Sequence, residues 1–226
     1  MLEEAIAEKA KIKTIVICEE CIEQNSIEKK LLYEMAKYSC LYVSKKVLDS
    51  ITDVSNPQGV LAVIDKKEGS KKIDYSQEVL LILDGIQDPG NLGTILRTAD
   101  SVGLKQIIVS ANSGDIYNPK VVRSTMGAIF RVEVIESKNL QETLKEIKAN
   151  KFQIAATDLH TNKNIYQIDY NKTAIIIGNE ANGVSKELLQ QSDYRIRIPM
   201  IGKTESLNAS VATGIILYEY VRRKIN

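Results

Sequence analysis

The feature that most constrains the fold is a pattern that repeats from Glu78 onward: a short continuous apolar run, a turn rich in Gly, Asn, Asp or Ser, and then a helical pattern. Continuous apolar strands that alternate with helices are typical of a mostly parallel sheet covered on both faces. This part of the chain is therefore predicted to be α/β. The expected strands are Val79 to Leu83, Gln106 to Val109, Phe152 to Ala156, Thr173 to Ile177 and Tyr194 to Ile198.

Two helices of this part are indicated by apolar residues at helical spacing, which mark the buried face of an amphipathic helix. The first stripe ends at Gly103, and the second lies close to the C-terminus. The stripes are Leu92, Ile95, Leu96, Ala99 and Val102, and then Leu207, Val211, Ile215 and Tyr218.

The first 65 or so residues have a different pattern, which predicts a small α/β module. Between the two parts lies the charged segment Lys66 to Lys72, which has the composition of a linker. We therefore expect a small domain over residues 1–70 and a larger domain over residues 71–226. In the small domain we expect a strand at Thr14 to Cys18, a helix around Ile27 to Lys37, a strand at Leu41 to Ser44, a short helix near Lys45 to Ile51, and a strand at Gly59 to Ile64.

Charge and hydropathy limit the partners that this chain can have. The 30 basic and 29 acidic residues give a net charge of +1. A polyanion would therefore have to bind local patches of positive charge. No apolar run reaches the roughly 18 to 20 residues that cross a bilayer, so no membrane partner is expected and the protein is predicted to be soluble and cytoplasmic.

Three cysteines are present, Cys18, Cys21 and Cys40, and an odd number argues against a disulfide framework. Cys18 and Cys21 form a C-x-x-C, but a zinc site would need a second pair or a nearby histidine, and the only histidine is His160. Zinc binding and redox activity stay open as alternatives to a pair of inert thiols. We expect no metal site.

Two nucleotide-binding fingerprints can be tested in the loops that follow the strands, and both fail. Gly90 and Gly93 match the end of G-x-G-x-x-G, but Asp88 replaces the remaining glycine. The second loop has the glycine spacing of a phosphate-binding P-loop, but Val184 replaces its lysine and Glu180 would repel a phosphate. A nicotinamide-dependent oxidoreductase is therefore disfavoured.

Three segments, taken in order, closely resemble the three signature motifs of the SpoU-type (TrmH-like) RNA ribose methyltransferases. They are Asp84 to Asp100, Ile177 to Gly183, and Ile198 to Met200 with Ser206 to Ala212. The resemblance extends over residues 79–223 and includes Val122 to Ala128.

The opening module, with Asn56 to Val60, resembles the small substrate-binding domain of this family. Relatives usually carry further basic residues before the position of Met1. We therefore expect the grip of this chain on RNA to be incomplete.

The resemblance implies a SPOUT-like fold, in which a parallel sheet ends in a C-terminal trefoil knot. It also implies S-adenosylmethionine as the cofactor, bound among the knot loops, and a homodimer formed through the last helix. The cofactor-binding residues implied in this sequence are Thr157, Gly178, Asn179, Glu180, Gly183, Ile198, Met200, Ser206 and Leu207.

The family assigns catalysis to the arginine of the first motif, here Arg97, with Asn91, Ser206, Asn208 and Glu180 as the other catalytic positions. Arginine is the side chain least able to lose a proton, so it could instead hold a phosphate and stabilise a developing alkoxide. A surface ion pair between Arg97 and Asp100 remains the structural alternative.

RNA contacts are implied for Arg97, and for Arg123 because a guanidinium in a polar segment suits a phosphate. We therefore expect methylation of a ribose 2′-hydroxyl in structured RNA, with ribosomal RNA favoured. Transfer RNA is the alternative substrate, and a non-catalytic RNA-binding scaffold that keeps the knot is the alternative of another class.

Overall fold

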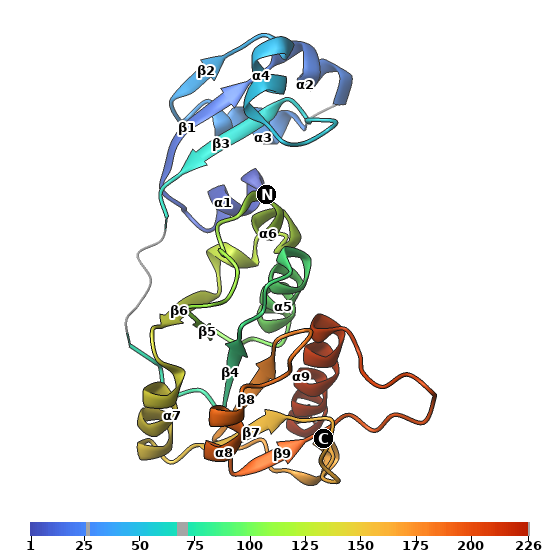
Figure 1. Cartoon of the computed structure of the whole chain (residues 1–226). Coiled ribbons are helices and arrows are strands. Elements are labelled where there is room, and N and C mark those ends of the chain that lie inside the picture. The colour runs from blue at the N-terminus through green and yellow to red at the C-terminus, as the bar shows by residue number, and fades with distance from the viewer. Residues whose placement is uncertain (26–27, 67–71, 226) are drawn as a thin grey trace. The chain divides into compact units, whose positions relative to one another are not determined.

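The structure is a computed structural model that describes residues 1–25, 28–66 and 72–225, and the chain divides into two compact units (Figure 1). The units are Met1–Lys67 and Glu68–Asn226. Of the predicted linker, residues 67–71 lie outside the described residues. Within the described ranges, none of the helices has the length and apolar character that crossing a bilayer requires.

The first unit is a three-stranded sheet with helices on both faces. Its strand order is β2-β1-β3, with β2 parallel and β3 antiparallel to the central strand. The helix predicted around Ile27 to Lys37 begins at Lys29, and Ile27 lies outside the described residues. The elements are α1 (Leu2–Ala7), β1 (Ile12–Ile17), α2 (Glu19–Asn25), α3 (Lys29–Met35), β2 (Cys40–Tyr42), α4 (Lys45–Ile51) and β3 (Val60–Ile64).

The C-x-x-C pair lies in the core of this unit. Cys18 and Cys21 are buried, and their Sγ atoms are 2.9 Å apart. The hydrogen bond with Cys18, together with burial, raises the pKa of Cys21 to about 11, so this thiol stays neutral at physiological pH. Among the described residues no three His, Cys, Asp or Glu side chains gather into a metal-binding group. The contacts are those of two packed thiols.

The second unit is built on a six-stranded sheet in the order β6-β5-β4-β8-β7-β9, and every pairing in it is parallel. Each of the five predicted strands is present. The elements are β4 (Val79–Asp84), α5 (Pro89–Ser101), β5 (Gln106–Ser110), α6 (Pro119–Ser124), η1 (Ala128–Phe130), β6 (Glu133–Ser137), α7 (Leu140–Ala149), β7 (Gln153–Thr157), η2 (Ile165–Gln167), β8 (Thr173–Gly178), α8 (Lys186–Gln191), β9 (Tyr194–Ile196) and α9 (Ala209–Ile225).

Strand β6 is absent from the sequence prediction. Glu133 and Glu136 interrupt its apolar run, and the strand lies at the edge of the sheet, where one side of the ladder is open. Such a strand alternates between buried and exposed positions and gives a weak apolar signal. At the opposite edge, β9 ends at Ile196, two residues before the predicted end, because the backbone of Arg197 pairs with Lys163 and Ile165 instead.

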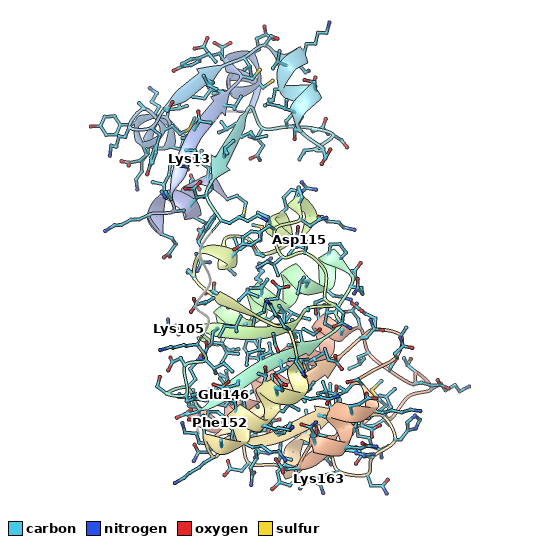
Figure 2. The ribbon with its side chains drawn as sticks, turned by 60° about the vertical axis from the view of Figure 1, so that its left-hand side comes forward. Lys13, Lys105, Asp115, Glu146, Phe152 and Lys163 are labelled. Carbon is cyan, nitrogen blue, oxygen red and sulfur yellow. The ribbon has the colours of Figure 1, made fainter. Side chains whose placement is uncertain are left out.

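Helices cover both faces of this sheet, as the continuous apolar strands predict. On one face, α5, α6 and α9 pack on alternate residues of β4 such as Leu81 and Leu83. On the other face, α7 and α8 pack on Leu80 and Ile82. Figure 2 labels Glu146 of α7 and Phe152, which lie on this second face; the hydroxyl of Tyr75 donates to Glu146 at 2.8 Å, and its ring packs against Phe152.

The C-terminal helix is present where predicted, but its predicted apolar stripe does not form the buried face. Val211 and Tyr218 are 50% and 53% exposed, whereas Thr213, Ile216 and Leu217 are fully buried. The prediction of the stripe was wrong in orientation because small and polar side chains near the start of α9 pack against α5 instead. The trefoil knot implied by the resemblance stays a prediction.

Near its end, α9 is fixed by a buried carboxylate. The side chain of Glu219 accepts hydrogen bonds from Arg222 and Arg223, and these lower its pKa to about 2 despite the opposing effect of burial. Arg223 also donates to the carbonyl oxygens of Tyr166 and Ile168. The helix is therefore tied to η2.

Candidate functional site

The three predicted motifs begin at the carboxyl edge of the second sheet, where the strand order changes direction. Strands β4 and β8 are neighbours, and their register places Asp84 opposite Gly178. In open α/β sheets, ligands bind outside the carboxyl ends of strands at such a switch point. The loops that leave these two strands are therefore the first place to look for a site.

The first loop runs from Gly85 to the start of α5. The amide of Gly85 donates to Ser110 Oγ at 2.8 Å, which fixes the exit from β4. Asp88 is the N-cap of α5, and its side chain accepts the amide of Asn91 at 2.7 Å, with Pro89 at the first helical position. Asp88 therefore caps the helix, and the side chain of Asn91 is available for other contacts.

The second loop turns back on itself directly after β8. The backbones of Asn179 and Gly183 exchange two hydrogen bonds of 3.0 and 2.9 Å, and Asn179 Oδ1 accepts the amides of Ala181 and Asn182. A Cβ on Gly178 would lie 2.1 Å from backbone atoms of Gly183 and Val184. Only glycine at position 178 permits this closed turn.

Side chains of the second loop bind the first loop. Asn179 Nδ2 donates to the carbonyl oxygen of Gly85 at 2.7 Å, and Glu180 Oε1 accepts from Asn91 Nδ2 at 3.0 Å. Glu180 also accepts the amides of Gln87 and Asp88 at 3.3 and 3.2 Å. Partial burial alone would raise the pKa of Glu180, but these hydrogen bonds outweigh it and lower the pKa, so Glu180 is an anion at neutral pH.

The third motif joins the same group through Asn208. Its Oδ1 accepts the amides of Ser210 and Val211 at the start of α9, and its Nδ2 donates to Asn91 Oδ1 at 2.8 Å. A single chain of hydrogen bonds therefore runs from Asn208 through Asn91 to Glu180. These three hydrogen-bonded residues connect all three motifs.

The rest of the third loop is open. Figure 1 shows the segment between β9 and α9 extending away from the sheet. Ser206 and Met200 are exposed, Ile198 and Leu207 are half-buried, and Ile201 is fully exposed. Among the described residues, no hydrogen bond involves the backbone of residues 198–207 or the hydroxyl of Ser206. This segment therefore offers unpaired backbone donors and acceptors beside apolar side chains.

That combination fits the purine ring of a cofactor, because backbone groups can bind the edge of the ring while apolar side chains cover its face. Thr157 lies at the end of β7, beside β8, and its hydroxyl donates to the carbonyl oxygen of Ile176 at 3.1 Å. One cleft of about 350 Å³ lies beside Asp84, Ser110 and Ser185, and a second of about 370 Å³ lies beside Gln77. The predicted cofactor residues line neither cleft.

Arg97 and Arg123 are both exposed. Arg97 lies on α5, and Asp100 is not its partner, since Asp100 pairs with Arg131 at 2.9 Å. The ion-pair alternative for Arg97 is therefore wrong. Arg123 lies on α6, which packs on α5. Within the described parts of the chain, neither guanidinium has a hydrogen-bond or ion-pair partner.

Sequence reasoning missed the residues that support this group. Asp88 caps α5, Ser110 holds Gly85, and Asp84 Oδ2 accepts the amide of Ser185 at 2.8 Å. The Asp-Pro pair at position 88 was a usable signal, because a capping residue followed by proline is typical of a helix start. The roles of Ser110 and Ser185 depend on sheet register and had no local signal.

Comparison with known proteins adds a family. Residues 78–218 match the model of the SpoU rRNA Methylase family, and residues 1–62 match the MRM3-like substrate binding domain. The chain is 32% identical over 219 residues to the 23S rRNA (guanosine(2553)-2'-O)-methyltransferase RlmP of Bacillus subtilis, an alignment that covers 96% of this chain and 84% of that protein.

Two solved structures are similar over nearly the whole chain. The SpoU methyltransferase AviRb from Streptomyces viridochromogenes, in complex with its cofactor AdoMet, has a TM-score of 0.85 and 26% identity, covering 100% of this chain and 88% of that one. The AdoMet-bound rRNA methyltransferase from Sinorhizobium meliloti has a TM-score of 0.84 and 32% identity, covering 98% and 84%.

Proposed function

Because this chain belongs to the SpoU rRNA methylase family, we propose that it transfers a methyl group from S-adenosylmethionine to a ribose 2′-hydroxyl of ribosomal RNA. The observation that supports the proposal is the chain of hydrogen bonds that joins Asn208, Asn91 and Glu180. It brings the three motif loops to one edge of the sheet, at the switch point where α/β proteins bind ligands. The retained side chains argue against a non-catalytic scaffold.

Within this site we propose that the ends of β7 and β8 and the open third loop hold the cofactor. Thr157, the turn from Gly178 to Gly183 and the segment from Ile198 to Leu207 provide the backbone groups and apolar surface. The bound cofactor would supply an activated methyl group on a positively charged sulfur. Asn91, Asn208 and Glu180 act as positioning residues, since their side chains bind one another.

Arg97 is the catalytic residue in this proposal. Its guanidinium is exposed and free of partners in the described chain, so it can bind the substrate without breaking an existing ion pair. It would hold the phosphate next to the target ribose and stabilise the negative charge that develops on the 2′-oxygen as its proton passes to water. Ser206 is exposed in the third loop and would orient the ribose.

We assign the recognition of RNA structure to the small unit, residues 1–70, and methyl transfer to residues 71–226. The match of residues 1–62 to a substrate binding domain supports this division. The Bacillus relative is named for 23S ribosomal RNA, which makes ribosomal RNA the substrate to test first and transfer RNA the alternative.

The test is to incubate unmodified 23S ribosomal RNA, made by transcription, with the full chain and methyl-labelled S-adenosylmethionine. The RNA is then digested to nucleosides. We expect the label in a single 2′-O-methylated nucleoside. Label in a base, or label only when transfer RNA replaces the ribosomal transcript, would contradict the proposed reaction or the proposed substrate.

We also propose that the protein is a homodimer. Val211 and Tyr218 form an exposed apolar stripe on α9, and Ile215 lies between them. Apolar side chains gathered on one helix face of a soluble protein are typical of an interface. Sedimentation equilibrium should give twice the chain mass for the wild type, and a double Val211→Ser, Tyr218→Ser variant should sediment as a monomer. A wild-type monomer would contradict the proposal.

A further inference from the structure

Met126 combines two unfavourable features in one position. It follows α6 with φ +50°, in the left-handed region, and the residue is 57% exposed. The residue after a helix often takes this conformation, but Gly or Asn is favoured there because other side chains are strained. A methionine at this position therefore costs folding stability and leaves apolar surface in water.

The segment that carries Met126 is held firmly in place. Thr125 is fully buried, and its hydroxyl donates to the carbonyl oxygen of Val122 at 2.7 Å. Helix α6 also lies against α5 so closely that a Cβ on Gly93 would be 2.5 Å from Ser124 Cβ. Gly93 is two residues from Asn91, so this contact fixes Met126 relative to the start of α5.

Helix α6, which precedes Met126, and its neighbour α5 carry exposed cations. Arg97, Lys120 and Arg123 are exposed, and none has an acidic partner within the described chain. Arg97 is four residues after Gly93, so it lies on the side of α5 that meets α6. Asp115, labelled in Figure 2, precedes α6, and its carboxylate accepts the amide of Tyr117 at 2.8 Å.

An exposed apolar side chain among unpaired cations suits RNA, in which phosphates alternate with bases that offer apolar faces. A second copy of this chain fits less well, because a symmetric contact between two α6 helices would bring Lys120 and Arg123 against like charges.

We propose that Met126 is a positioning residue that packs against an unstacked base next to the target ribose, while Lys120 and Arg123 hold the adjoining phosphates. This inference rests on the proposed function and adds a residue to it. The contact fixes where the RNA lies and takes no part in the transfer of the methyl group. Removing it should weaken the binding of RNA and leave cofactor binding unchanged.

The experiment replaces Met126 by Asn, which tolerates the left-handed conformation. With transcribed 23S ribosomal RNA we expect KM, and the Kd from filter binding, to rise about tenfold, equivalent to ~1.4 kcal/mol. We expect kcat and the Kd for S-adenosylmethionine to stay within about twofold, and the thermal midpoint to stay equal or rise, because strain is relieved. A Met126→Leu variant keeps an apolar side chain and should bind RNA as the wild type does.

Lys151 provides a matched control. It follows α7 with φ +65°, and its amide donates to the carbonyl oxygen of Lys148, as that of Met126 does to Arg123. Lys151→Asn should therefore change stability as Met126→Asn does and leave the KM for RNA unaltered.

An unchanged Kd for RNA in Met126→Asn would overturn the inference, and so would a change in self-association with unaltered RNA binding. Filter binding needs no methyl transfer, so it tests Met126 even if the wild type proves inactive. A wild type that binds RNA but transfers no methyl group would contradict the proposed function, and the binding result would still test Met126.

Discussion

Replacing Gly178 by Ala is expected to abolish cofactor binding and to lower the free energy of unfolding by about 3 kcal/mol. The added Cβ would lie 2.1 Å from the carbonyl carbon of Gly183 and from the amide of Val184, and both obstacles are backbone atoms that cannot rotate away. The turn after β8 must therefore open, which displaces Asn179 and Glu180 from the first loop. Calorimetric titration with S-adenosylmethionine and thermal unfolding measure the two effects.

Gly202 is the matched control, because it lies in the third loop and an added Cβ there would meet no atom within 4 Å. Gly202→Ala should keep the free energy of unfolding within about 0.5 kcal/mol of the wild type. If Gly178→Ala bound the cofactor as the wild type does, the closed turn would not be part of the site.

Replacing Arg97 by Ala is expected to lower kcat/KM for RNA methylation by roughly 10³-fold, the size of effect seen when a group that stabilises developing negative charge is removed. Arg97→Lys keeps the charge and loses the planar fork, so we expect it to lose about 10²-fold. Arg97 is exposed and has no partner in the described structure, so neither change should alter the thermal midpoint or the affinity for the cofactor.

Arg131 is the control for a guanidinium that already has a partner. It pairs with Asp100, which lies on α5 as Arg97 does. Arg131→Lys keeps the positive charge and should leave kcat/KM within about twofold, since Arg131 already has Asp100 as its partner. Near-normal turnover of Arg97→Lys would show that a positive charge alone suffices, and near-normal turnover of Arg97→Ala would remove Arg97 from the mechanism.

The sequence predicted the strands of the second unit because their burial on both faces leaves an apolar run that needs no other information. The same reasoning missed β6, whose Glu133 and Glu136 belong to an edge strand. It also misjudged α9, where Val211 and Tyr218 have the helical spacing of a buried stripe and are exposed. Helical spacing identifies an apolar face. Whether the same chain buries that face depends on how the helix packs against its neighbour, here α5.

The resemblance predicted that the three loops meet around one cofactor, but the side-chain contacts that join the loops could not have been predicted. That Glu180 accepts the amides of Gln87 and Asp88 depends on β4 and β8 being neighbours in a defined register. That Asn208 reaches Asn91 depends on the packing of α9 against α5. Both are contacts between residues about a hundred positions apart, and no local pattern encodes them.

The central claim is that three loops held together by Asn208, Asn91 and Glu180 form one cofactor site. Calorimetric titration of the full chain with S-adenosylmethionine tests it most directly. The account predicts saturable binding of one cofactor molecule per chain, weakened in the Asn91→Ala and Asn208→Ala variants. Absence of saturable binding by the wild type, or binding that neither variant alters, would contradict it.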